Sequence, residues 1–357
     1  MSCSSQHHRL CARCALIELA RHRLENFEIP RIAQLRPNLW GLSFGLMKLL
    51  PARFMLDRAE DLGLLIPGGQ IVETTSGTFG MALAMLSAAR GYSLTLVSAD
   101  SLIDKTFAHR LKLLGATLIV TDDPEGSGNQ QSRLEIVDRI LTKDPRAFWP
   151  NQYANPDNPM SYAAVASLIV RKIGHVDRLV ASVGSGGSLS GTAQFLKIAF
   201  PDLEIVAVDT HGSVLFGQPL APRRLRGMGN SIIPANLRHE LVDHVHWVGV
   251  KPAHEAMLAL YRSHGIFAGP TSGAAFLVAD WIARSSPDLK TVFLAADEGH
   301  RYTSTAYSID PHSIDHRPVE AISSGPTAVR IGTVGNETDW SVFDWARRSL
   351  AGFTPSA

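Results

Sequence analysis

The stretch QIVETTSGTFG, residues 70–80, joins a short apolar run to a glycine-containing loop and then to the small, helix-forming residues MALA (81–84). A second stretch, RLVASVGSGGSLSG at residues 178–191, repeats this order. In both places a strand is expected to end in a turn that begins a helix. The first N–H groups of a helix lack backbone partners and carry the positive end of its dipole, so each turn can bind an anion. Two such turns predict a bipartite ligand, with one anionic group on a cofactor and another on a substrate.

Short apolar runs alternate with longer amphipathic stretches from about residue 70 onward. The expected strands are 71–74, 93–98, 117–121, 178–183, 204–208, 246–250 and 291–295, and expected helices include 105–114, 132–142, 162–173, 253–264 and 274–285. This alternation predicts an α/β fold with parallel-rich open sheets and helices on both faces. Such folds bind ligands beyond the carboxyl ends of their strands, where both glycine-containing turns fall.

A segment rich in proline and asparagine, FWPNQYANPDNP at residues 148–159, predicts a crossing between two α/β lobes. The last part of the chain loses the alternation and is expected to be a tail or a dimer arm. The predicted organisation is an N-terminal tail at 1–20, a smaller lobe at 41–155, a larger lobe built from 21–40 and 156–318, and a C-terminal tail at 319–357.

The composition is that of a globular enzyme rather than a nucleic-acid or membrane protein. Of 357 residues, 45% are hydrophobic and 19% are charged, and the net charge is +1 without a long basic run. No apolar stretch is long enough to cross a bilayer, and the first residues lack the apolar centre of a signal peptide. A cytoplasmic protein is expected, without nucleic-acid or membrane partners.

The three cysteines, Cys3, Cys11 and Cys14, all lie near the start of the chain. Their odd number and clustering argue against a disulfide framework. The CxxC spacing, with His7 and His8 nearby, leaves open a zinc half-site, a heme ligand region, a redox pair or a tail. No second CxxC or HxxxH completes a metal set, which favours the tail and predicts no metal site.

Lys48 lies in the apolar segment FGLMKLLP, residues 44–51. Its amine is expected either in water at a helix edge or in an apolar pocket. In a pocket, loss of solvation lowers the pKa of the amine and makes it nucleophilic, as a Schiff-base lysine requires. Most lysines are solvated, so the surrounding sequence has to decide between these alternatives.

The surrounding sequence resembles the fold-type II pyridoxal-phosphate enzymes, in particular the cysteine synthase and cystathionine β-synthase group. That family has a Schiff-base lysine, an Ala-Glu pair eleven residues later, a Gly, a Pro-Gly and a Thr-Ser-Gly-Asn-Thr-Gly loop. The matching residues here are Lys48, Ala59-Glu60, Gly63, Pro67-Gly68 and 75–80. Similar segments continue in the family's order at 152–156, 184–188, 227–229, 269–275 and 297–302, so the resemblance covers about residues 30–310.

This resemblance implies a two-lobed, tryptophan synthase β-like fold with pyridoxal 5'-phosphate between the lobes. Lys48 would hold the cofactor as a Schiff base and later move the substrate's α-proton. The other implied cofactor-binding residues are Gly184, Ser185, Gly186, Gly187 and Ser188 at the phosphate, Thr78 in place of the family's Asn at the phenolic oxygen, and Thr271 at the pyridine nitrogen. The implied substrate site consists of Thr75, Ser76, Gly77, Phe79 and Gln152.

The implied reaction is β-replacement or β-elimination on a serine- or cysteine-type amino acid through aminoacrylate, in a homodimer. Departures from the family's pattern, at Leu46, Thr78, Phe79, Ser231 and residues 165–169, gather around the substrate and predict a changed substrate or nucleophile. Two alternatives remain open: a cysteine desulfhydrase-type or other lyase, and a catalytically silent paralogue that binds the cofactor. A dinucleotide-dependent oxidoreductase is disfavoured, because Leu189 takes the place of the third glycine of GxGxxG.

Overall fold

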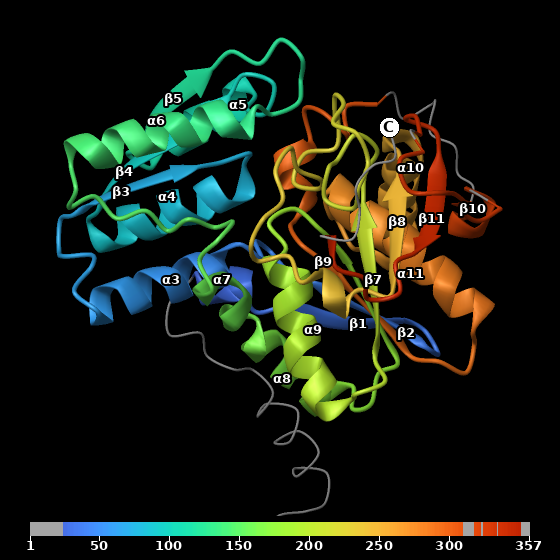
Figure 1. Ribbon diagram of the computed structural model, residues 1–357. Helices are drawn as coiled ribbons and strands as arrows, with labels where there is room; N and C mark the ends of the chain where they lie inside the picture. Colours follow the sequence, from blue (N-terminus) through green and yellow to red (C-terminus); the bar gives the residue numbers. More distant parts are fainter. Residues whose placement is uncertain (1–23, 310–317, 323, 334, 351–357) are drawn as a thin grey trace, which may run out of the picture.

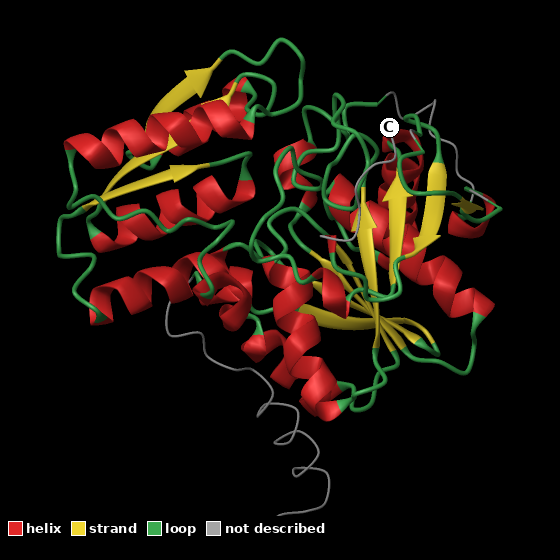
Figure 2. Ribbon diagram, viewed as in Figure 1, coloured by secondary structure: helices red, strands yellow, loops and turns green. Residues whose placement is uncertain are grey.

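A computed structural model describes residues 24–309, 318–322, 324–333 and 335–350, and its two sheets lie in separate lobes (Figure 1). Helices cover both faces of each sheet, which confirms the predicted α/β fold (Figure 2). Within these ranges no helix has the length and apolar character needed to cross a membrane. The predicted N-terminal tail with its cysteines lies outside the described residues.

The small lobe is built on a parallel sheet with the strand order β3-β4-β5. Its strands are β3 (Gln70–Thr74), β4 (Ser93–Ala99) and β5 (Thr117–Thr121), and its helices are α3 (Leu49–Asp61), α4 (Thr78–Arg90), α5 (Lys105–Leu113) and α6 (Gln130–Lys143). Alternate strand residues point to opposite faces. Ile71 therefore packs with side chains of α3, α4 and α5, whereas Val72 packs on the side of α6.

The large lobe is built on a sheet with the order β1-β2-β9-β6-β7-β8-β11-β10. Its strands are β1 (Arg31–Arg36), β2 (Leu39–Ser43), β6 (Arg178–Ser182), β7 (Glu204–Asp209), β8 (His244–Val248), β9 (Thr291–Ala295), β10 (Thr327–Ala328) and β11 (Trp340–Asp344). Its helices are α2 (Glu25–Glu28), α7 (Asp157–Ser161), α8 (Ala163–Lys172), α9 (Gly187–Ala199), α10 (Val250–His264) and α11 (Pro270–Ser285), with short 3-10 helices η1 (His239–Leu241), η2 (Gly299–Tyr302) and η4 (Val319–Ala321). The strands from β2 through β8 in this order run parallel.

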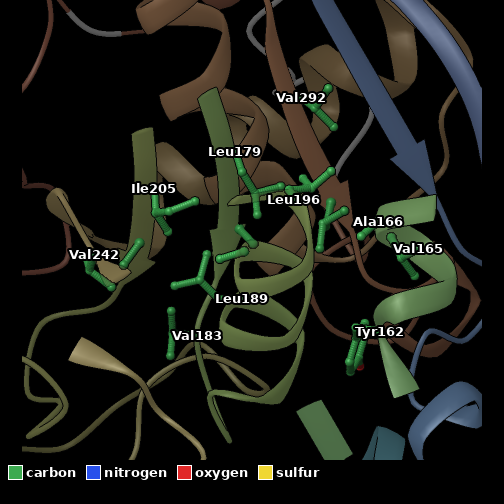
Figure 3. Close-up of a cluster of buried hydrophobic side chains, with 14 of the residues drawn as sticks. Tyr162, Val165, Ala166, Leu179, Val183, Leu189, Leu196, Ile205, Val242 and Val292 are labelled. Atoms are coloured by element: carbon green, nitrogen blue, oxygen red, sulfur yellow. The ribbon is translucent and has the colours of Figure 1, made fainter. Parts of the chain in front are cut away.

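The core of the large lobe has a layer on each face of this sheet. Leu179 and Ala181 of β6 point toward α8 and α9, and Figure 3 shows this layer with Leu189 and Leu196 of α9. Val180, between them, belongs to the layer under α10 and α11. Strands buried on both faces read as continuous apolar runs, which is why these strands could be recognised in the sequence.

The small lobe is inserted into the large one, because β1 and β2 precede it and β6 to β9 follow it. The chain leaves the large sheet after Ser43, at the end of β2, rather than at residue 41 as expected. It returns after Phe148, whose backbone still bonds to Gln70 and Val72 of β3. The two crossings therefore lie at about residues 44–48 and 149–156.

The expected C-terminal tail is wrong in part, since residues 340–344 form β11, antiparallel to β8. Trp345 is fully buried beside Phe216 and His239, with ring centroids 5.1 and 5.4 Å away. Trp340 is also buried, and its Nε1 donates to Nδ1 of His246 at 3.1 Å. A single short strand, separated from the others by loops, gives too little periodicity to be recognised, although Trp340 within it and Trp345 just after it signal burial.

Candidate active site

The carboxyl ends of both sheets face one pocket between the lobes. The loops after β3, β4 and β5 approach it from the small lobe, and the loops after β6 and β7 approach it from the large lobe. Of the residues predicted from sequence, Lys48, Ser76, Thr78, Phe79, Gln152, Gly184 and Ser185 line the pocket. The lining also includes side chains that the sequence did not single out as site residues, among them Arg133, Tyr153, Arg223, Arg226 and Asn230.

Lys48 is the N-cap residue of α3 and lies at the first crossing between the lobes. Its Nζ donates a hydrogen bond to Oγ of Ser185 at 3.1 Å, so the amine reaches the glycine-rich loop that begins α9. Burial lowers the pKa of the amine to about 8, and the nearby carboxylate of Glu73 opposes this shift in part. A lysine in this state has a substantial neutral fraction near neutral pH, as a nucleophilic amine requires.

The loop at 184–188 forms a concave site at the N-terminus of α9. Gly186 has φ +80°, and a Cβ there would lie 2.6 Å from the backbone of Leu237. A Cβ on Gly187 would lie 2.2 Å from Oδ1 of Asn158. Glycine is therefore required at both positions, and it leaves the N–H groups of this 13-residue helix open to an anion. The buried hydroxyls of Ser185 and Ser188 lie in the same loop.

The side chains of Thr75 and Gln152 fix the conformation of the predicted substrate loop. Oγ1 of the buried Thr75 accepts hydrogen bonds from the N–H of Gly77 at 2.9 Å and of Gly80 at 3.0 Å. Nε2 of Gln152 donates to the carbonyl of Thr74 at 3.1 Å. Thr75 and Gln152 thus shape the loop, whereas Ser76 and the first residues of α4 face the pocket. Phe79, 2% exposed, also faces it and narrows the space beside the loop.

Glu73, which the sequence analysis treated only as part of a strand, is a fully buried carboxylate beneath this loop. It accepts hydrogen bonds from the N–H of Thr74 at 2.8 Å, from Nε1 of Trp149 at 3.1 Å and from the N–H of Gln152 at 3.1 Å. Burial raises its pKa to about 7, against the effect of these donors. Glu73 therefore joins the substrate loop to the second crossing between the lobes. The sequence signal that could have identified Glu73 is its position as a charged residue inside an apolar run.

Thr271 is the second residue of α11 and is buried, at 3% exposure. A Cβ on Gly227 would lie 3.5 Å from its Cγ2, so Thr271 lies behind the glycine that lines the pocket. Gly77, Gly186, Gly187 and Ser188 likewise belong to the loops around the pocket without forming its lining.

Three arginines converge on the pocket from distant parts of the chain. Arg133 of α6 is 3% exposed, donates from Nε to the carbonyl of Gly128 at 2.9 Å, and has a buried Nη1 with no hydrogen-bond partner among the described residues. Arg223 and Arg226, in the loop after β7, donate to the carbonyls of Ser127 and Leu102. Burial lowers the pKa of all three guanidinium groups. The four residues RRLR at 223–226, just before the quoted 227–229 segment, were the sequence signal for two of them.

Comparison with known proteins decides the family. Residues 41–296 match the model of the pyridoxal-phosphate dependent enzymes. The chain belongs to this family. The enzyme is 36% identical over 268 residues to the N-(2-amino-2-carboxyethyl)-L-glutamate synthase of Ralstonia nicotianae, covering 74% of this chain and 79% of that protein. It is also 36% identical over 269 residues to a probable cysteine synthase of Bacillus subtilis, covering 73% of this chain and 85% of that protein.

The solved structures lead to the same family. A cysteine synthase from Entamoeba histolytica superposes with a TM-score of 0.76 and 26% sequence identity, over 90% of this chain and 98% of that one. These similarities confirm the fold-type II architecture and a pyridoxal 5'-phosphate-dependent transferase or lyase of the cysteine synthase-like group. The reaction predicted from sequence, β-replacement on a serine- or cysteine-type amino acid, agrees with these relatives.

The described residues fit this cofactor. The loop at 184–188 supplies backbone N–H groups, two serine hydroxyls and a helix N-terminus for the phosphate, and glycines keep this space free of side chains. Lys48 supplies an amine of lowered pKa within reach of the same loop. The dinucleotide alternative is not supported, because this loop and the lysine together match the pyridoxal-phosphate family.

Proposed function

We propose that this enzyme replaces the β-substituent of a serine-type amino acid by an incoming nucleophile that carries carboxylate groups of its own. The observation that supports this most is the set Arg133, Arg223 and Arg226 beside Lys48 in one pocket. A nucleophile as small as sulfide would give these three cations no carboxylate to bind.

The charge of these arginines is not neutralised by contact. Among the described residues none of the three forms an ion pair, and their hydrogen bonds go to neutral backbone carbonyls. Asp209, Asp123 and Asp104 are near enough to act on the pKa of these groups, but none of them contacts a guanidinium. A buried charge that no carboxylate contacts is unfavourable, and a carboxylate that entered the pocket would offset this penalty. Guanidinium groups also bind carboxylates through paired hydrogen bonds that fix the ligand's orientation.

The names of the relatives agree with a nucleophile of this class. The product named for the Ralstonia nicotianae enzyme is glutamate whose nitrogen carries a 2-amino-2-carboxyethyl group. A second enzyme of the same name, from Cupriavidus metallidurans, is 34% identical over 271 residues. We therefore extend the proposal to an amino acid with a second carboxylate, such as L-glutamate, as the nucleophile.

Pyridoxal phosphate, when bound, acts as an electron sink that stabilises the negative charge left on the α-carbon. In the proposed roles, Lys48 would hold the cofactor and its neutral amine would take the α-proton. Ser76 and the backbone N–H groups around residues 75–80 would bind the α-carboxylate of the first substrate, and Thr75 and Gln152 shape that loop. Gly184, Ser185, Gly186, Gly187 and Ser188 would bind the cofactor's phosphate, Thr78 its phenolic oxygen and Thr271 its pyridine nitrogen.

The test pairs serine and its O-acetyl and O-phospho esters with sulfide, homocysteine and L-glutamate, with products identified by mass spectrometry. We expect a glutamate adduct as the main product. Removing one guanidinium, in Arg226→Gln, should lower kcat/KM for glutamate about tenfold or more and leave turnover with sulfide nearly unchanged. A preference for sulfide that Arg226→Gln does not alter would contradict the proposal and favour a cysteine synthase.

The proposal includes a homodimer, which rests on the family resemblance, and the cytoplasmic location that the sequence analysis expects. Light scattering of the purified holoenzyme tests the first: a mass near 77 kDa, about twice the 38.7 kDa of one chain, is expected, and a monomer would contradict it.

A further inference from the structure

Three arginines of the large lobe each bind the loop that follows one strand of the small sheet. Arg301 donates from Nη2 to the carbonyl of Ser76, after β3, at 3.1 Å. Arg226 donates from Nη1 to the carbonyl of Leu102, after β4, at 3.0 Å, and Arg223 donates to the carbonyl of Ser127, after β5. Arg223 and Arg226 also line the pocket, whereas Arg301 does not. The function of Arg301 therefore depends on the loop that it binds, which contains Ser76.

Arg301 lies flat against the substrate loop. A Cβ on Gly77 would be 2.0 Å from its Nη2 and 2.3 Å from its Cζ, so the guanidinium occupies the space that any other residue at 77 would fill. Gly77 also has φ +147°, a conformation that side chains rarely adopt. Both observations explain why residue 77 is a glycine. The short distances to Arg301 also show that its guanidinium packs closely against the loop.

The position of Arg301 is fixed from both sides. Its Cζ lies 4.5 Å from the ring centroid of Phe107 in α5, a cation–π contact with the small lobe. The next residue, Tyr302, is buried and donates from its hydroxyl to Oδ2 of Asp297 at 2.8 Å, which anchors η2 in the large lobe. Among the described residues Arg301 forms no ion pair. Its positive charge therefore lies next to the loop without a carboxylate in contact with it.

We propose that Arg301 is a positioning residue for the first substrate: it holds the loop at 75–80 in the conformation that binds the α-carboxylate and places a positive charge behind it. The inference rests on the proposed role of this loop. Loss of the guanidinium should weaken binding of the amino-acid substrate more than binding of the cofactor. Lys48 and the loop at 184–188, which are assigned to the cofactor, belong to other segments, and Thr78 alone lies in the loop that Arg301 holds.

The experiment compares Arg301→Met and Arg301→Lys with the wild-type holoenzyme. In Arg301→Met we expect KM for the serine-type substrate to rise about tenfold, with kcat and KM for the nucleophile changed much less. Arg301→Lys should restore part of the loss, because an ammonium group can also donate to the carbonyl of Ser76. Arg110→Met, which removes an exposed guanidinium from α5, is the matched control and should leave KM unchanged.

Amide hydrogen exchange measured on the holoenzyme gives a readout independent of turnover. In Arg301→Met, peptides covering residues 75–80 should exchange faster, while those covering 184–191 should not change. An unchanged KM with unchanged exchange would overturn the proposal. A joint loss of kcat and cofactor content without rescue by lysine would also overturn it, because that result indicates a general structural role. If the wild type performed no β-replacement, the proposed function would fail, whereas the exchange comparison would still test the hold of Arg301 on the loop.

Discussion

At the scale of single residues, the chemistry depends on the protonation of the Lys48 amine. Its pKa is lowered to about 8 by burial, so the folded protein carries a neutral, nucleophilic amine above that pH. We expect the rate at which the apoprotein captures pyridoxal phosphate covalently to rise with pH and to level off above about 8. Stopped-flow absorbance across the pH range measures this rate. A midpoint near the ordinary value of a lysine would contradict the prediction.

The control for this experiment is Lys48→Ala, which should bind the cofactor without forming a covalent bond. Borohydride reduction of the loaded wild type, followed by peptide mass spectrometry, should place the label on Lys48. A label on any other lysine would refute the assignment, whatever the catalytic activity.

At the scale of secondary-structure elements, β11 and Trp345 complete the large lobe. The Trp345 ring is fully buried among Phe216, His239 and Phe343. Trp345→Ala should lower the free energy of unfolding by about 3–5 kcal/mol, because it leaves a cavity in a closely packed core. Urea denaturation followed by circular dichroism measures the change. Leu64→Ala, at a side chain that is 60% exposed in the other lobe, is the control and should have little effect.

Most elements of both sheets could be predicted because their sequences are locally distinctive. β5 and β9 have the predicted bounds, and the other predicted strands except β8 are within one residue of theirs at each end. β8 begins and ends two residues earlier than predicted. It ends at Val248, because Gly249 caps the next helix and Val250 already belongs to α10. The pair β1 and β2 was not predicted, because β1 is an edge strand that has no fully buried residue and therefore lacks a clear apolar face.

The site could be predicted only where it is built from continuous motifs. The two glycine-containing loops and Lys48 are local signals, and the structure places all of them around one pocket. Arg133, Arg226 and Arg301 come from three segments whose closeness results from tertiary packing. Although Arg226 and Arg301 lie in or beside segments that match the family, an arginine in a sequence is usually a solvated residue. Their role depends on their burial in the folded chain and on hydrogen bonds to backbone carbonyls rather than to carboxylates, and neither property can be derived from the sequence.

At the scale of the whole molecule, the arginines that line the pocket between the two lobes predict how the enzyme responds to an anionic ligand. A ligand that binds only the folded state raises its stability, by about 2.7 kcal/mol at a concentration one hundred times its Kd. L-Glutamate should therefore raise the melting temperature of the holoenzyme, and the shift should be reduced in Arg133→Met and in Arg226→Gln. Differential scanning calorimetry measures the shift. L-Glutamine, which keeps the α-carboxylate and replaces the side-chain carboxylate by an amide, is the matched control ligand. An equal shift with it would contradict a site for the second carboxylate.

The insertion of the small lobe has a consequence for how the enzyme can move. A lobe tied to its neighbour by two chain segments can only swing about an axis that passes near those ties. Lys48 ends the first tie and Gln152 lies in the second, close to that pivot. The loops at residues 102 and 127 follow the carboxyl ends of β4 and β5, away from these two segments. In such a rotation the Lys48 amine, which lies near the axis, moves least, and the loops at residues 102 and 127 move farthest. The pocket can therefore open at these loops while the reacting nitrogen keeps its position.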